Sequence, residues 1–209
     1  MTEPAPRLPP LPLDRWDDDV RAAMREGAPA ELIEKYMSTG PDAVPVPNVL
    51  GTLAHHPAMA RPFLKFNAVL LRKPTIEPRL RELMVLRVAW RTRSTYEWAQ
   101  HVRLAERYAV TPDDVAAIGE GHTAPRWSPL EADLLAATDQ LLDSYRIDDD
   151  IWARLAEHFD ERQLVELLFV VGTYTCLAMA FNSFGLQLDP EVRAMSIPPL
   201  PATPQDGAA

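Results

Sequence analysis

Three titratable residues between positions 82 and 101 have the types and spacing that proton transfer requires. Glu97 and His101 are four residues apart, so on a helix they lie one turn apart on the same face. A carboxylate beside an imidazole favours the charged form of the histidine, and such a pair can move a proton to or from a bound molecule. Glu82 interrupts an apolar run upstream, where a buried charge is tolerated only with a partner. We therefore predict that Glu82, Glu97 and His101 form a reaction centre.

Each of these residues also has a purely structural explanation. Ser94 and Glu97 have the S-x-x-E spacing of a capping box, in which both side chains bond backbone N–H groups at the start of a helix. Glu82 could instead form a buried ion pair with Arg87, which lies in the same apolar run. The residues alone leave both explanations open.

The segments that must position these residues are punctuated like helices. Pro78 suits the first turn of a strongly apolar helix, and Ser94 opens the next one. Later starts at Ser128 and Asp160 are each followed three residues on by a glutamate or a glutamine, as in a capping box. No strand-like alternation is sustained over more than a few residues. The sequence therefore predicts a single all-α domain over residues 14–195.

Both ends of the chain are rich in proline. Five of the 21 prolines lie at or before Pro12, and four lie at or after Pro198. Residues 1–13 and 196–209 are therefore predicted to be extended arms, either disordered or laid over a neighbouring subunit. The sequence does not reveal whether these arms close a pocket.

One apolar stretch, from Leu164 to Phe181, is about long enough to span a membrane. It contains Glu166, whose unpaired carboxylate would be costly in lipid. We therefore predict a core or oligomer-interface helix, and no membrane association. Tyr174 on this helix is either a pocket residue or a core group with its own hydrogen-bond partner.

Composition excludes several classes of partner. The net charge of −9 and the pI of about 5.0 argue against nucleic acid and anionic lipid. The single cysteine, Cys176, excludes an intramolecular disulfide framework. The first residues have neither a basic nor an apolar signal region, so a cytoplasmic location is expected.

The stretch RELMVLRVAWRTRSTYEWAQH resembles the carboxymuconolactone decarboxylase and alkylhydroperoxidase D-like (AhpD-like) superfamily, and the resemblance extends over about residues 45 to 110. In the peroxidase branch, a glutamate precedes Cys-x-x-Cys and a histidine follows the second cysteine by four residues. Glu82 and His101 match the glutamate and the histidine, whereas Ser94 and Glu97 occupy the cysteine positions. Because disulfide chemistry needs both thiols, we expect no peroxidase activity of that kind. The segment YEWAQH instead matches the YEWxxH pattern of the decarboxylase branch.

The resemblance implies an AhpD-like helical bundle that assembles as a trimer, hexamer or dimer. It also implies a cofactor-independent lyase acting on a small unsaturated or cyclic organic acid. We expect His101 to be the general acid, Glu97 to orient it or relay its proton, and Glu82 to hold the network together. Arg87 is the expected cation for a substrate carboxylate or for Glu82. The other expected substrate-binding residues are Tyr96, Trp98 and His55.

Alternatives remain open at this point. An isomerase, hydratase or cyclase could use the same acid/base pair, and a non-catalytic helical oligomer could use these residues as a buried structural network. A metal site built from His55 or His56 with Glu97 and His101 has no supporting motif, so neither a metal nor another cofactor is expected.

Overall fold

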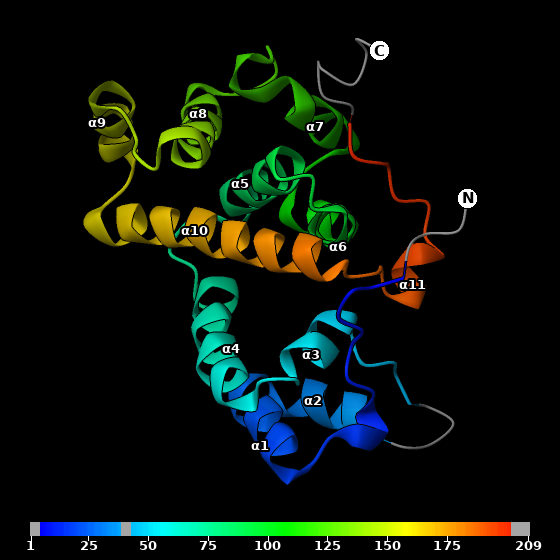
Figure 1. Ribbon diagram of the computed structural model, residues 1–209. Coiled ribbons are helices and arrows are strands. Elements are labelled where there is room, and N and C mark those ends of the chain that lie inside the picture. Colours follow the sequence, from blue (N-terminus) through cyan, green and yellow to red (C-terminus); the bar gives the residue numbers. More distant parts are fainter. Residues whose placement is uncertain (1–4, 39–42, 202–209) are drawn as a thin grey trace. The chain divides into compact units, whose positions relative to one another are not determined.

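The computed structural model describes residues 5–38 and 43–201. These residues form α-helices and short 3-10 helices and include no strand, which confirms the predicted all-α class. Residues 1–4 and 202–209 of the two proline-rich arms lie outside the described part. The elements, shown in Figure 1, are η1 (Leu13–Arg15), α1 (Asp18–Gly27), α2 (Ala30–Met37), α3 (Asn48–Leu53), α4 (Pro57–Arg72), α5 (Pro78–Arg91), α6 (Thr95–Ala105), η2 (Glu106–Tyr108), α7 (Pro112–Ala117), η3 (Ile118–Thr123), α8 (Pro129–Ser144), α9 (Asp149–His158), α10 (Glu161–Phe184) and α11 (Pro190–Arg193).

The chain divides into two compact units. The first contains residues 1–73 and 183–189, and the second contains residues 74–182 and 190–209. Their boundary falls at Lys73 and Pro74, where proline ends a helix. Residues 14–195, predicted as one domain, therefore include parts of both units.

The first unit is built on the pairing of α1 with α4. Gly27 permits this close contact, because a Cβ atom at its position would lie 2.6 Å from the Cβ of Leu64. Trp16, Val20 and Met24 anchor the apolar core of this unit. The described part of the N-terminal arm lies along the same unit, where the Leu11 N–H donates to the Gly51 carbonyl at 2.9 Å.

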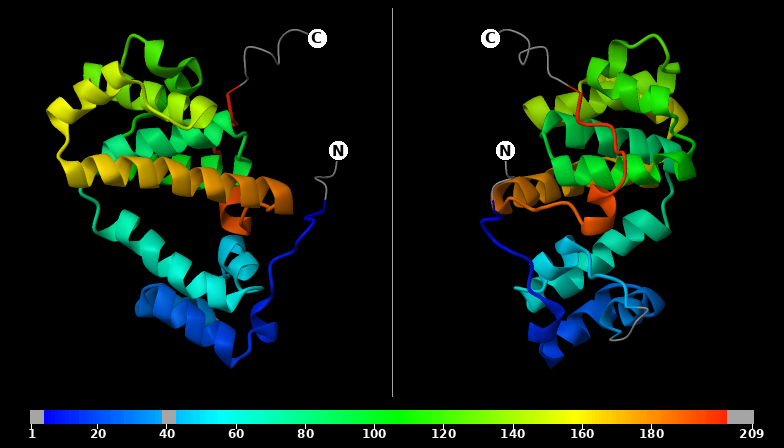
Figure 2. Two further views of the ribbon diagram at one scale, coloured as in Figure 1. Left: turned by 60° about the vertical axis from the view of Figure 1, so that its left-hand side comes forward. Right: turned by 90° about the vertical axis from the view of Figure 1, so that its right-hand side faces the viewer.

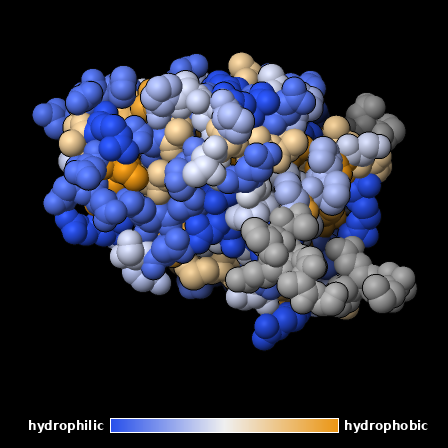
Figure 3. Space-filling model, turned by 90° about the horizontal axis from the view of Figure 1, so that it is seen from above, coloured by the Kyte–Doolittle hydropathy of each residue, from blue (hydrophilic) through white to orange (hydrophobic). Residues whose placement is uncertain are grey.

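The second unit surrounds α5, which packs against α6, α8 and η3. Every residue of α5 from Leu80 to Trp90 is buried, as expected for a helix that is apolar nearly all round. Figure 2 shows α10 crossing the same group of helices. The molecular face in Figure 3 is mainly hydrophilic, with scattered apolar residues, as is usual for a protein surface.

Two of the predicted helix starts have the expected capping boxes. The Ser128 hydroxyl accepts from the Glu131 N–H, and the Glu131 carboxylate accepts from the Ser128 N–H. Asp160 and Gln163 make the same reciprocal pair of bonds at the start of α10, at 2.9 and 3.0 Å. These bonds satisfy N–H groups that have no acceptor within the helix.

The long apolar stretch forms the middle of α10. By length and composition α10 is the one described helix that could cross a membrane, and 44% of its most apolar window is buried in the protein. The Glu166 carboxylate accepts from the N–H and the hydroxyl of Thr75, at 2.7 and 2.5 Å. A carboxylate bound in this way fits a helix packed within a protein, and one such helix is weak evidence for a membrane span.

Candidate active site

Glu82 and His101 form a buried hydrogen-bonded pair across α5 and α6. The Nδ1 atom of His101 lies 2.7 Å from Oε1 of Glu82, and the Glu82 side chain is 1% exposed. The His101 side chain is 13% exposed, and its Nε2 atom has no hydrogen-bond partner among the described residues. Because the carboxylate accepts the Nδ1 proton, Nε2 is the nitrogen that can give or take a proton. The predicted meeting of these two residues is observed.

Glu97 is buried near the start of α6 without any hydrogen bond. It is 2% exposed, and both carboxyl oxygens lack a hydrogen-bond partner among the described residues. Ser94 is the N-cap residue of α6, yet its side chain makes no capping bond and its hydroxyl is also buried without a partner. The capping-box explanation of Glu97 is therefore wrong, because neither of its two bonds forms.

Burial controls the protonation of Glu97. Removal from water raises the pKa of its carboxyl to about 8, an effect that the nearby Ser94 hydroxyl only partly opposes. At neutral pH the side chain is therefore mainly a neutral carboxylic acid. In this form it can donate a hydrogen bond to an oxygen of a bound molecule.

The orientation of His101 depends on Glu82 rather than on Glu97. Glu97 lies one turn before His101 on α6, but no hydrogen bond joins them in the described structure. The expectation that Glu97 orients the imidazole is therefore not met. The partner comes from α5, nineteen positions away in the chain, which short-range helical spacing cannot indicate.

Two further residues lie in this region: Tyr174, which the sequence analysis left as either a pocket residue or a core group, and Arg81, which it did not name. The ring of Tyr174, on α10, meets the His101 ring edge-on, with 5.0 Å between centroids. Burial raises the pKa of the Tyr174 hydroxyl, the Glu82 carboxylate raises it further, and the Arg81 guanidinium opposes them. Arg81 is itself buried, 5.0 Å above the ring of Tyr108. The only feature of the sequence that pointed to Tyr174 was its polar hydroxyl group within the apolar stretch of α10.

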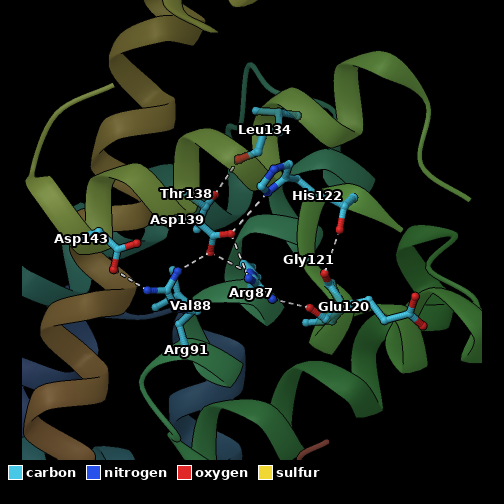
Figure 4. A network of polar contacts seen from close by, with 12 residues as sticks. Arg87, Val88, Arg91, Glu120, Gly121, His122, Leu134, Thr138, Asp139 and Asp143 are labelled. Carbon is cyan, nitrogen blue, oxygen red and sulfur yellow. Dashed lines mark hydrogen bonds and ion pairs between the residues drawn. The ribbon is translucent and has the colours of Figure 1, made fainter. Parts of the chain in front are cut away.

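Arg87 is bonded to α8 and η3 rather than to Glu82. Its Nε and Nη2 atoms donate to the two carboxylate oxygens of Asp139, both at 2.8 Å, and Nη1 donates to the Ile118 carbonyl at 2.6 Å. Figure 4 shows Arg87 and Arg91 converging on Asp139 of α8. The predicted bond from Arg87 to Glu82 is therefore not formed, whereas its contact with a substrate carboxylate stays a prediction. Five residues correspond to about 140° around a helix, so Arg87 points away from the side that carries Glu82.

The other predicted substrate-binding residues are placed as follows. Tyr96 is buried with its ring edge-on to Phe181, at 5.1 Å. Trp98 is buried and donates its indole N–H to the Pro198 carbonyl at 2.8 Å. His55 belongs to the first unit, where Nε2 lies 2.9 Å from the Pro9 carbonyl oxygen. Their contact with a substrate stays a prediction.

The described side chains contain no group of three histidine, cysteine, aspartate or glutamate residues arranged to hold a metal ion. Glu82 and His101 make a pair, and Glu97 makes no bond to either. The geometry therefore provides an oriented imidazole, a neutral buried acid and a neighbouring tyrosine. These groups suit proton transfer.

Solved structures of AhpD-like proteins have the same fold. An AhpD-core protein from Ralstonia eutropha JMP134, described as peroxidase-related and uncharacterized, matches with a TM-score of 0.73 and 20% identity over 95% of this chain and 100% of its own. An uncharacterized peroxidase-related protein from Silicibacter sp. TM1040 matches with a TM-score of 0.72 and 16% identity, over 93% of this chain and 98% of its own. The debrominase Bmp8 in complex with 2,3,4-tribromopyrrole matches with a TM-score of 0.69 and 16% identity, over 92% of this chain and 97% of its own. The class is therefore an AhpD-like all-α fold.

One family model matches part of the sequence. Residues 57–140 match the carboxymuconolactone decarboxylase family, and this range includes Glu82, Glu97 and His101. This match covers less than half of the chain and indicates a similarity to that family, in keeping with the resemblance of the sequence motif. A comparison with curated proteins found no matching relative.

Replacing Glu97 with glutamine is expected to change how stability depends on pH. In the unfolded chain a glutamate loses its proton near pH 4.5, whereas in the folded protein Glu97 keeps it up to about pH 8. Between these pH values the glutamate is ionised mainly in the unfolded chain, so the free energy of unfolding of the wild type falls as the pH rises. Glutamine does not ionise, so the variant does not lose stability in this way. From pH 5 to pH 8 the free energy of unfolding of Glu97→Gln should rise relative to wild type by more than about 1 kcal/mol.

Urea unfolding followed by tryptophan fluorescence at several pH values measures this difference. The matched control is Glu106→Gln, which changes an exposed glutamate directly after α6 and should track the wild type. If the difference in free energy of unfolding between Glu97→Gln and wild type stays constant from pH 5 to pH 8, Glu97 is not protonated in the folded protein at neutral pH.

Proposed function

We propose that the protein is a cofactor-independent enzyme of the lyase type, which transfers a proton to a small unsaturated or cyclic organic acid. The observation that carries this proposal is the buried bond between Glu82 and His101, which leaves Nε2 of His101 without a partner. On the same helix, one turn earlier, Glu97 has a buried carboxyl without a hydrogen-bond partner. A purely structural network would use these hydrogen-bonding groups within the protein.

The proposed reaction needs no cofactor because the substrate itself accepts the electrons. When the bond to the carboxylate breaks, its electron pair moves into a conjugated carbonyl, and CO₂ leaves a dienolate. Protonated His101 then delivers the Nε2 proton to one carbon, which forms the new C–H bond, and regains a proton from solvent. Glu82 is a positioning residue, whose bond to Nδ1 fixes the orientation of the imidazole.

Glu97 stabilises the developing charge in this scheme. Its neutral carboxyl can donate a hydrogen bond to the dienolate oxygen, and such a donor is most effective where water is excluded. A charged carboxylate at the same place would repel both the substrate and the dienolate. The raised pKa of Glu97 therefore matches the proposed role at neutral pH.

Two positions that hold cysteine in the peroxidase branch hold other residues in this chain, which argues against thiol chemistry. Ser94 and Glu97 lie where the peroxidase branch has its two cysteines, and Cys176 is exposed on α10. Two thiols within reach of each other are required to form and reduce a disulfide. We therefore propose no disulfide-based peroxidase role, although two structural neighbours are described as peroxidase-related.

One observation favours an isomerase, hydratase or cyclase as the second candidate. The cation expected to hold a substrate carboxylate, Arg87, is bound to Asp139 instead. The same imidazole and neutral acid could move a proton within an unsaturated carbonyl compound without loss of CO₂. The debrominase neighbour, which binds a brominated pyrrole, is a further example of this fold with a small ring compound.

Turnover of a defined compound panel tests the proposal. Purified wild-type protein is incubated with carboxylated lactones and with unsaturated acids that lack a lactone, and CO₂ release and product isomers are both measured. CO₂ release that depends on the enzyme supports the lyase. Rearranged product without CO₂ supports the second candidate, and no conversion across the panel by folded protein would favour the structural network.

We also propose that the protein is a homo-oligomer. Apolar residues of α10 recur at helical spacing on its exposed side, namely Val165, Phe169 and Met179. An exposed apolar row of this kind is costly in water and is covered when a second copy packs on it. Light scattering on the purified protein should give a mass above 23.4 kDa, and a stable monomer would contradict this.

A further inference from the structure

The proline-rich segment after α11 is bonded to the two helices that carry the reaction centre. The Trp98 indole N–H donates to the Pro198 carbonyl at 2.8 Å, and the Trp90 indole N–H donates to the Pro201 carbonyl at 2.9 Å. Arg93 donates to the same Pro201 oxygen at 2.7 Å. Leu200 packs against the apolar core of the second unit. In Figure 1 this segment is the red trace beyond α11.

The donors and the acceptors in this contact are chemically matched. Proline has no N–H, so a segment such as Ile-Pro-Pro-Leu-Pro favours the extended polyproline II helix, whose carbonyls make no internal hydrogen bonds. This helix has three residues per turn, so carbonyls at Pro198 and Pro201 face the same side. The indole group is a donor only, and Trp90 and Trp98 are 6% and 2% exposed. The two buried donors therefore need the acceptors that the segment provides.

A glycine in the protein surface allows the segment to approach closely. A Cβ atom at Gly119 would lie 3.0 Å from the Cβ of Pro201 and 3.2 Å from Nε1 of Trp90, so a larger residue would press on this contact. Arg93, directly after the C-cap residue of α5, has a φ of 54°, which is uncommon for a residue with a side chain. Its unusual backbone accompanies the bond from its guanidinium to Pro201.

We propose that Trp90, Arg93 and Trp98 form a recognition surface for extended proline-rich segments, and that its occupant is residues 196–201 of the same chain. This mode of binding combines indole donors with the backbone carbonyls of a preformed extended helix. The proposal does not depend on the enzymatic activity proposed above. It assigns the described part of the C-terminal arm to its own subunit, whereas the sequence analysis expected an arm that is either disordered or laid over a neighbouring subunit.

The bound segment also forms one wall of a cavity. A space of about 340 Å³ lies beneath residues 195–198, and Val102, Val110 and Val115 contribute to its other walls. The start of the segment is therefore less closely packed than its end, where Pro201 meets Gly119 and Trp90. Release of the segment would open this cavity and remove the acceptors from both indole groups.

The first experiment uses the full chain and follows solvent exchange of the indole protons by ¹⁵N-resolved NMR. In wild type, the signals of Trp90 and Trp98 should exchange at least about ten times more slowly than that of Trp152, which is partly exposed on α9. In a variant that combines Pro198→Gly and Pro201→Gly, both should exchange several-fold faster, because glycine makes the extended segment costlier to order.

Trp127 is the internal control for this experiment. It donates its indole N–H to the Gly121 carbonyl at 2.8 Å, away from the segment, and its exchange should not change. The proposal is overturned if Trp90 and Trp98 exchange as fast as Trp152 in wild type. It is also overturned if the glycine variant leaves their exchange unchanged.

A second experiment tests recognition in trans. A chain that lacks residues 196–209 is titrated with the amidated peptide Ser-Ile-Pro-Pro-Leu-Pro, in which the amide keeps the last carbonyl as an acceptor. Saturable recovery of the slow Trp90 and Trp98 signals is expected, and Trp98→Phe should weaken binding about five-fold. A scrambled peptide that binds equally well, or no binding by a truncated chain of native helicity, would contradict the proposal. If truncation prevents folding, the full-chain experiment decides.

Discussion

His101→Asn is expected to lower kcat at least about 100-fold on any substrate that the wild type converts, while the fold is kept. The asparagine amide can occupy the place of Nδ1 and donate to Glu82, but it has no group that can deliver a proton from the position of Nε2. General acid catalysis contributes about 10²–10⁴-fold, so the loss should be large. Turnover and the circular dichroism spectrum are measured on the same preparations.

Two further variants make this result specific. His158→Ala removes an exposed histidine at the end of α9 and should leave turnover unchanged. Glu82→Gln should lower kcat less than His101→Asn, because the glutamine amide oxygen can still accept the bond from Nδ1. Folded His101→Asn protein with wild-type turnover would remove His101 from the mechanism.

Asp139→Asn is expected to lower the free energy of unfolding by about 3 kcal/mol, because it leaves two buried or half-buried guanidinium groups without their shared counter-charge. Asp139 accepts two bonds from Arg87 and a third from Arg91, and its side chain is largely buried. A loss of this size should lower Tm by about 6–12 °C in a chain of this length. Four of the five tryptophans belong to the same unit, so fluorescence reports its unfolding.

Asp133→Asn is the matched control for this prediction. Asp133 lies on the same helix and makes a similar forked contact, but its partner Arg154 is half exposed. Surface ion pairs contribute little, because water screens them, so this variant should stay close to wild type. Equal losses in the two variants would show that the site on α8, rather than the buried charge pair, sets the effect.

The sequence predicted the helices and the key residues better than it predicted their partners. Proline and capping residues place the starts of α5, α8 and α10 correctly, because these signals act within a single turn. The pair of Glu82 and His101 was reached through the family motif, since the two residues come from different helices. Helical spacing instead pointed to Glu97, which makes no bond to the imidazole.

Arg87 and Ser94 show why partners are hard to predict from a sequence. A helix that is apolar nearly all round has no polar face, so its pattern does not tell which neighbour Arg87 meets. Ser94 and Glu97 have the letters of a capping box, but the box forms only if the side chains turn towards the backbone N–H groups. In the folded chain they do not, and both groups remain buried and unbonded.

The residue types alone decide which chemistry is available at Glu82, Glu97 and His101. A glutamate in place of the redox cysteine removes the thiol and supplies an acid, and no packing can reverse that change. Only the tertiary structure decides that Glu82 holds His101, that Arg87 is bound to Asp139, and that Glu97 is removed from water. These properties depend on desolvation and on hydrogen bonds between distant segments, which local sequence does not encode.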